Sequence, residues 1–143
     1  MWTDHLIAVI WGPPIAMGRH RCSKHGRPYL PEKSRAGLKK NTFVIASAMR
    51  DQEIWLIDKK IPISVELVFV HPRPKNMRYS DKRTPKTTKP DLDNLIKMVL
   101  DSCSRANVWH DDNQITQITA HDFYASSSEQ EAKTIIKVCY WQA

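Results

Sequence analysis

The sequence has little cysteine, little glycine and no long apolar run. Its three cysteines, Cys22, Cys103 and Cys139, are an odd and widely spaced set among 143 residues. This pattern argues against a disulfide framework and is typical of a reducing compartment. The longest early apolar run, residues 6–11, is too short for a secretory signal or a membrane span. We therefore expect a cytoplasmic protein with free thiols, no membrane partner and no small-molecule cofactor.

Acidic residues are also scarce relative to basic ones. The chain has 22 Lys and Arg against 15 Asp and Glu, a net charge of +7. Eight of the basic residues lie between Arg19 and Lys40, and seven between Arg73 and Lys89. Clustered positive charge of this kind suits a polyanion such as nucleic acid. The alternative is a merely basic protein whose charges face solvent.

Hydrophobic periodicity predicts one α+β domain over residues 1–143. Short apolar or alternating runs predict strands at 6–11, 61–70, 114–125 and 131–141. Helical spacing predicts helices at 34–57, with Ser34 as a candidate cap, and at about 91–104. The order β-α-β-α-β-β favours a mixed sheet with both helices packed on it.

Two segments between these elements carry most of the positive charge. Residues 12–33 form a basic loop in which His25-Gly26 is a candidate hairpin turn and Tyr29 a possible stacking partner. Residues 71–90 contain four prolines, seven basic residues and one acidic residue, so we expect a mobile arm without a core of its own. The predicted DNA contacts are Arg19, Arg21, Lys24, Arg27, Arg73, Lys75, Arg78, Lys82, Arg83, Lys86 and Lys89. The alternatives are a solvated loop and a solubilising linker.

Carboxylates open and close the stretch from 89 to 113. Asp91 and Asp93 follow Pro90 directly, and Asp111 and Asp112 end the stretch. If Asp91, Asp93 and one of the later pair converge within about 6 Å, each like-charged pair costs roughly 3 kcal/mol at an effective dielectric of about 20. A divalent cation relieves this repulsion, and oxygen-only ligands suit Mg²⁺, with Mn²⁺ as a substitute.

Each carboxylate also has a simpler interpretation. Asp91 is well placed to cap the helix, and Asp93 to complement the helix dipole. Asp111 and Asp112 could simply form a turn between helix and strand. Taken together on a basic chain, the four favour a metal site in which either Asp111 or Asp112 is the last ligand.

The motif Asp-Leu-Asp-Asn-Leu-x-Lys, then Leu-Asp-Ser, then Trp-x-Asp-Asp-x-Gln resembles the RusA family of Holliday-junction resolvases. The resemblance implies catalytic roles for Asp91, Asp93, Lys97 and Asp112, with the three carboxylates binding Mg²⁺. It also implies a homodimer that resolves four-way DNA junctions by paired nicks in recombination and repair, for example on a phage or prophage genome. Two alternatives remain open, a less selective Mg²⁺-dependent nuclease of branched or flap DNA and a non-catalytic junction-binding protein.

Overall fold

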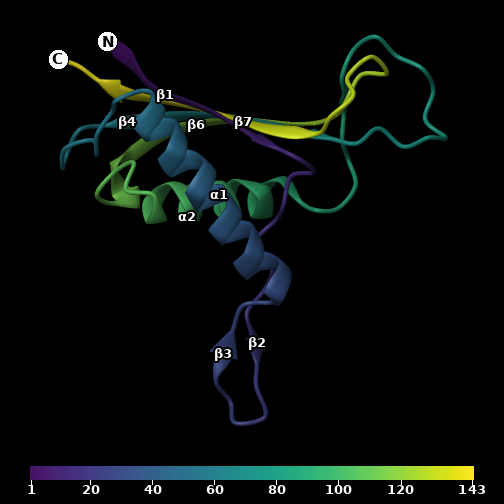
Figure 1. The fold of residues 1–143 in the computed structure, drawn as a ribbon, viewed down its shortest axis with the longest axis horizontal. Helices are drawn as coiled ribbons and strands as arrows, with labels where there is room; N and C mark the ends of the chain where they lie inside the picture. Colours follow the sequence, from purple (N-terminus) through teal and green to yellow (C-terminus); the bar gives the residue numbers. More distant parts are fainter.

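The computed structural model describes residues 1–143 and places both helices on one face of a mixed sheet (Figure 1). The elements are β1 (Trp2–Trp11), β2 (Arg21–Cys22), β3 (Pro28–Tyr29), α1 (Glu32–Asp51), β4 (Ile63–His71), β5 (Thr84–Pro85), α2 (Leu92–Arg105), the 3₁₀ turn η1 (Asp112–Gln114), β6 (Ile115–Tyr124) and β7 (Lys133–Trp141). Five strands form the main sheet in the order β1-β7-β4-β6-β5. The predicted α+β fold with a mixed sheet and two helices is confirmed. Neither helix is long and apolar enough to cross a membrane.

The central strand β4 carries the core. It pairs with β7 in antiparallel and with β6 in parallel orientation. Its alternating residues Ile63, Val65, Leu67 and Phe69 are all buried, as their spacing predicted. A parallel pair needs a crossover connection, and α2 lies in the connection from β4 to β6. The fold therefore presses α2 against the sheet and fixes where both of its ends emerge.

The helix α1 begins two residues earlier than predicted and ends at Asp51 rather than near residue 57. It ends there because Gln52 turns to bind the backbone of the edge strand β1. The Gln52 side chain donates to the Ile7 carbonyl at 2.6 Å and accepts from the Ile7 N–H at 3.2 Å. The prediction that Ser34 caps this helix is wrong, since its hydroxyl accepts the Gly18 N–H at 2.9 Å instead.

A small second core fixes the base of the hairpin formed by β2 and β3. Met17, Leu38 and Met98 are buried together, which joins the segment before the hairpin to α1 and α2. The Met17 N–H donates to the Asn94 carbonyl in the first turn of α2 at 3.0 Å. Gly18 is required at this close approach, because a Cβ there would lie 2.9 Å from the Ser34 hydroxyl. The predicted hairpin turn at residues 25–26 is confirmed, and the hairpin projects away from the sheet beyond α1 (Figure 1).

The segment from 71 to 90 is attached to the sheet at several points. β5 pairs with β6, and the segment runs beside the connection from β6 to β7 (Figure 1). Arg73 donates to the Ala125 carbonyl at 3.1 Å, Arg83 forms an ion pair with Glu129 at 2.9 Å, and the Lys86 side chain is buried. The prediction of a mobile arm is therefore wrong at Arg73, Arg83 and Lys86. These cations find acidic or carbonyl partners on neighbouring elements, which composition alone does not reveal.

Candidate active site

Two of the predicted carboxylates lie at the beginning of α2. Asp91 is the N-cap residue, and its backbone carbonyl accepts the Leu95 N–H at 3.2 Å. Its side chain makes no capping hydrogen bond, so the carboxylate is free for a ligand. Asp93 is exposed in the first turn, and one of its oxygens accepts the Asn94 N–H at 3.0 Å. Both charges lie at the positive end of the helix dipole, which partly stabilises them.

An open pocket of about 600 Å³ surrounds Asp91. Three segments form it: residues 16–19 at the base of the hairpin, residues 89–91, and Asn94 on α2. Arg19 and Lys89 are the cations in its lining, and both were predicted to contact DNA. Positive side chains beside a free carboxylate suit a phosphate that binds together with a metal ion. Here the structure brings predicted site residues from the basic loop and from the end of the 71–90 segment together with Asp91.

Lys97 lies exposed one helical turn beyond Asp93. The simpler interpretation of this residue was an ion pair with Asp93 or Asp101 on the same helix. Its ammonium forms neither ion pair in this structure. The exposed acidic residues that do pair with a lysine are bound by Lys137 instead. The Lys97 side chain is therefore available to a ligand that approaches the start of α2.

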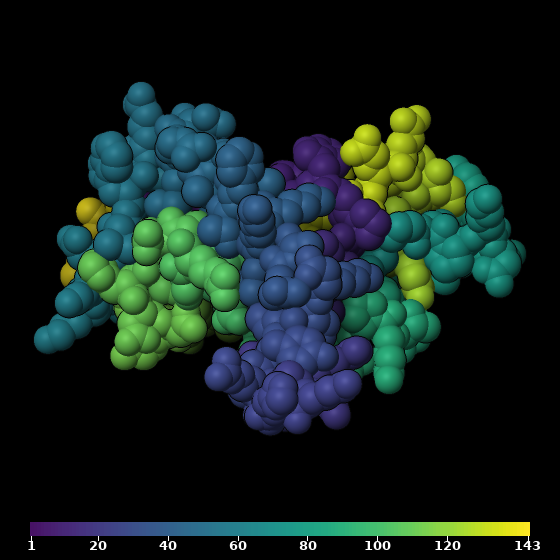
Figure 2. Space-filling model, turned by 60° about the horizontal axis from the view of Figure 1, so that its bottom comes forward, coloured from purple at the N-terminus to yellow at the C-terminus, as the bar shows by residue number.

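Asp112 lies at the other end of α2. One of its oxygens accepts the Ser104 hydroxyl at 2.6 Å and the Trp109 indole N–H at 2.9 Å. Burial, and secondly the nearby charge of Asp112, raises the pKa of Cys103 to about 12. Asp91 and Ser104 are 13 positions apart on α2, a separation of about 20 Å along the helix axis. Figure 2 shows the start of α2 and the residues after its end emerging on opposite sides of α1.

The prediction that Asp91, Asp93 and Asp112 converge is therefore wrong within a single chain. No three of its acidic, histidine or cysteine side chains are close enough to hold one metal ion. The physical reason is the length of α2, whose 14 residues keep the two acidic clusters apart.

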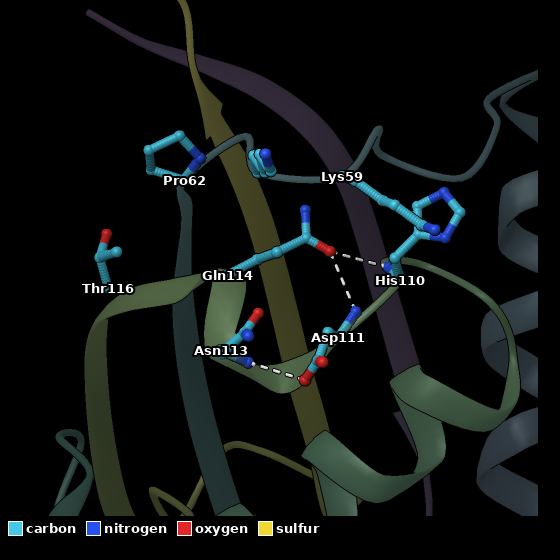
Figure 3. Close-up of a pocket in the computed structure, with 8 residues that line it drawn as sticks. Lys59, Pro62, His110, Asp111, Asn113, Gln114 and Thr116 are labelled. Atoms are coloured by element: carbon cyan, nitrogen blue, oxygen red, sulfur yellow. Dashed lines mark hydrogen bonds between the residues drawn. The ribbon is translucent and has the colours of Figure 1, made fainter.

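Asp111, the other choice for the last ligand, has a structural role in this chain. Its carboxylate accepts the Asn113 N–H at 3.2 Å and so caps η1. The Gln114 side chain completes the turn by accepting the N–H groups of His110 and Asp111 at 2.9 and 3.0 Å (Figure 3). These residues line an open pocket of about 710 Å³ together with Lys59, Lys60 and Pro62. The turn interpretation of Asp111 is thus confirmed.

The donor atoms at the start of α2 fit Mg²⁺ or Mn²⁺. Asp91 and Asp93 offer hard carboxylate oxygens that are largely free of protein hydrogen bonds. Mg²⁺ in proteins is often held by one or two carboxylates, with water and substrate phosphate filling the remaining positions. Asp91 and Asp93 would therefore hold such an ion, whereas Asp112 of the same chain lies too far away.

The predicted DNA-binding residues fall into two groups. Arg21, Lys24 and Arg27 are exposed on the projecting hairpin, and Arg19 lies at its base. In the 71–90 segment, Lys75, Lys82 and Lys89 have exposed side chains, and Arg78 is at the surface. Arg73, Arg83 and Lys86 are instead bound within the chain. The hairpin and its base therefore carry four unengaged cations, of which Arg19 lines the pocket at Asp91.

Sequence reasoning missed a buried ionic cluster beside the site. The cluster contains His71 at the end of β4, Asp122 on β6 and Lys86 directly after β5. Asp122 lies 3.7 Å from the Lys86 ammonium and 2.7 Å from the His71 ring. Burial lowers the pKa of His71, against the opposing effect of the Asp122 charge. The one sequence signal for this cluster is the position of Lys86 shortly before Asp91.

Comparison with known proteins agrees with these features. The family model described as Endodeoxyribonuclease RusA matches residues 12–138. Uncharacterized protein YqaN of Bacillus subtilis (strain 168) is 26% identical over 137 residues, covering 90% of this chain and 94% of the relative. Because the family match spans most of the chain and includes every predicted site residue from Arg19 to Asp112, this chain belongs to the RusA family of endodeoxyribonucleases.

Proposed function

We propose that this protein is a Mg²⁺-dependent endodeoxyribonuclease that resolves four-way DNA junctions as a homodimer, in recombination and repair. The observation that carries the proposal is the free Asp91 carboxylate, next to Asp93 and flanked by Arg19 and Lys89, in a chain of the RusA family. Carboxylates that hold a cation and basic residues that hold the backbone are what phosphodiester hydrolysis requires.

Each residue at the start of α2 has a part in this chemistry. When bound, the metal ion activates water and stabilises charge on the scissile phosphate. Asp91 and Asp93 would hold the ion through their free oxygens. Arg19 and Lys89 bind the neighbouring phosphates and align the strand. The Lys97 ammonium, one turn further along α2, reaches the scissile phosphate and stabilises the negative charge of the pentacovalent state.

A homodimer would explain why Asp112 lies far from Asp91. If a two-fold axis passes across α2 near its middle, the beginning of one copy's helix faces the end of the other's. Each of two equal sites then combines Asp91 and Asp93 of one chain with Asp112 of the second. The two sites would be separated by about the length of α2, roughly 20 Å. Such a pair matches the two opposed strands that must be cut in a four-way junction.

The function is tested by incubating a mobile four-way junction with the protein, with and without Mg²⁺, on a denaturing gel. We expect symmetric paired cuts only when Mg²⁺ is present. Asp91→Asn should abolish cutting while leaving junction binding intact, because the carboxylate repulsion in the site decreases. A linear duplex of the same sequence is the control substrate.

Three results would contradict the proposal in different ways. Equal cutting of the linear duplex would favour a less selective nuclease. Full cutting by Asp91→Asn would show that the site is wrongly assigned. Tight junction binding without any Mg²⁺-dependent cleavage by the wild-type protein would favour a non-catalytic binding protein.

A further inference from the structure

The Lys86 side chain lies under the loop that leads to Asp91 and is only 3% exposed. Its ammonium donates to the Pro90 carbonyl at 3.1 Å and also to the Thr88 carbonyl. A buried ammonium needs an acceptor for each of its donors, and here the chain that follows it supplies two of them. The loop from 86 to 90 is thus folded around its own first side chain.

Two strands of the sheet hold this ammonium in place. The Asp122 carboxylate on β6 is 3.7 Å from it and 9% exposed. The other oxygen of Asp122 accepts from the His71 ring at 2.7 Å, and His71 ends β4. The Lys86 N–H also donates to the Asp122 carbonyl at 3.0 Å. The ammonium is therefore fixed relative to the core, and the Pro90 carbonyl is fixed through it.

The Pro90 carbonyl belongs to the same peptide unit as the Asp91 nitrogen. On the other side, the Asp91 carbonyl accepts the Leu95 N–H inside α2. We propose that Lys86 is a positioning residue of the active site, whose buried ammonium orients the Pro90–Asp91 peptide and so aims the Asp91 carboxylate. This proposal depends on the proposed function, because it takes Asp91 as a metal ligand.

A simpler role for Lys86 would be to neutralise Asp122. The distances favour positioning, because the ammonium lies closer to the Pro90 carbonyl, at 3.1 Å, than to the carboxylate, at 3.7 Å. The second value exceeds a direct hydrogen bond. The strand that precedes Lys86 is moreover already attached to β6 through its backbone. The side chain is therefore not needed for that attachment.

A double substitution separates the two roles. Lys86→Met combined with Asp122→Asn removes both buried charges and leaves an acceptor for His71, so no charge is left unpaired. If Lys86 acts by positioning, single-turnover cleavage at saturating protein should fall roughly 10- to 100-fold, the effect of a small misplacement of a reacting group. Junction affinity should stay within about twofold of wild type, since the hairpin and surface lysines are unchanged. Cleavage at the wild-type rate would overturn the proposal.

Hydrogen exchange supplies a measurement that does not need activity. In the double variant, the Leu95 amide should exchange at least about tenfold faster, because its acceptor is the Asp91 carbonyl. Amides in the middle of β4 should keep their wild-type rates. Unchanged exchange at Leu95 would overturn the proposal. Equal acceleration of Leu95 and β4 would also overturn it, by showing that the cluster supports the whole fold.

Thr87→Val is the matched control, since it alters an exposed side chain in the same loop that has no part in the site or in DNA binding. It should leave both the cleavage rate and Leu95 exchange unchanged. If wild-type protein does not cut a junction at all, the proposed function fails. The exchange result then decides independently whether Lys86 orders the residues around Asp91.

Discussion

At the scale of single residues, the ion pair that attaches the 71–90 segment has a measurable pH signature. The Arg83 guanidinium donates to both oxygens of Glu129, at 2.9 and 3.0 Å. These hydrogen bonds lower the pKa of Glu129 to about 2, from a usual value of 4.5. Since the folded-state pKa is the lower one, the interaction stabilises the protein fully above pH 4.5. This stability is lost as the pH falls towards about 2.

Glu129→Gln should therefore lower the free energy of unfolding at pH 7 by about 1–2 kcal/mol, a value kept modest because the pair is partly exposed. The difference from wild type should narrow as the pH is lowered from about 4.5 to about 3. Urea unfolding curves at about pH 7, 4 and 3 measure it. Glu131→Gln, an exposed residue two positions along the chain, should show no such change. If the Glu129→Gln variant's free energy of unfolding were lower by the same amount at all three pH values, the loss could not come from the Arg83–Glu129 ion pair.

Residue roles were predictable where the partners are close in sequence. The position of Asp91 at the helix start followed from Pro90 and the apolar stripe after it, and Asp111 followed a common turn pattern. Arg83 and Glu129 are 46 residues apart, and no local pattern links them. Their pairing depends on how β6 and the connection after it pass beside the 71–90 segment, which only the three-dimensional fold determines.

At the scale of elements, helix α2 was predictable to within a residue at each end because its apolar stripe is continuous. The end of α1 was not, because Gln52 leaves the helix to bind β1, a contact between elements. The short strand β5 was also missed. Its two residues, one of them a proline, form a strand only because β6 lies beside them.

The hairpin formed by β2 and β3 is the element with the clearest consequence for DNA binding. It projects beyond α1 (Figure 1), and its base borders the pocket at Asp91. Replacing Arg19, Arg21, Lys24 and Arg27 with Gln should lower the slope of log affinity against log salt by about 0.9 for each phosphate that the variant no longer neutralises. The total would be roughly 3 to 4 if all four side chains bind phosphate. Junction-binding titrations at salt concentrations from about 50 to about 200 mM test this prediction.

The matched control replaces the same four residues with the other basic side chain, Lys for Arg and Arg for Lys. This variant keeps the charge and should keep the salt slope. An unchanged slope in the Gln variant would show that the hairpin is a solvated loop. DNA binding would then have to depend on Lys75, Lys82 and Lys89, whose side chains are exposed on the 71–90 segment.

At the scale of the whole molecule, the spacing from Asp93 to Asp112 does not reveal whether these residues meet within one chain or between two. A helix of 14 residues separates them in the monomer. The same interval would suit a symmetric pair of chains in which the helix start of each faces the helix end of the other. In the proposed dimer, the carboxylates that the sequence singles out come together only through a quaternary contact, which hydrophobic periodicity does not encode.

Mixing inactive subunits distinguishes these arrangements. Asp91→Asn and Asp112→Asn should each be inactive alone. If each site takes Asp112 from the second chain, a mixed dimer contains one site with both substitutions and one site with none. Random mixing in equal amounts makes about half of the dimers mixed, so about a quarter of wild-type sites should return. The product should be single nicks rather than paired cuts, because only one site of each mixed dimer is intact.

The matched control mixes Asp91→Asn with Asp93→Asn. These residues lie in the same helix turn, so every site in that mixed dimer carries one substitution, whichever chain supplies Asp112. No activity should return. If each site were instead built within one chain, the first mixture would stay inactive too, because every site would still lack one carboxylate. Restored nicking in the first mixture alone would therefore mean that a single chain of this protein has no complete active site. Dimerisation would then be a condition for cutting either strand, and not only for cutting both together.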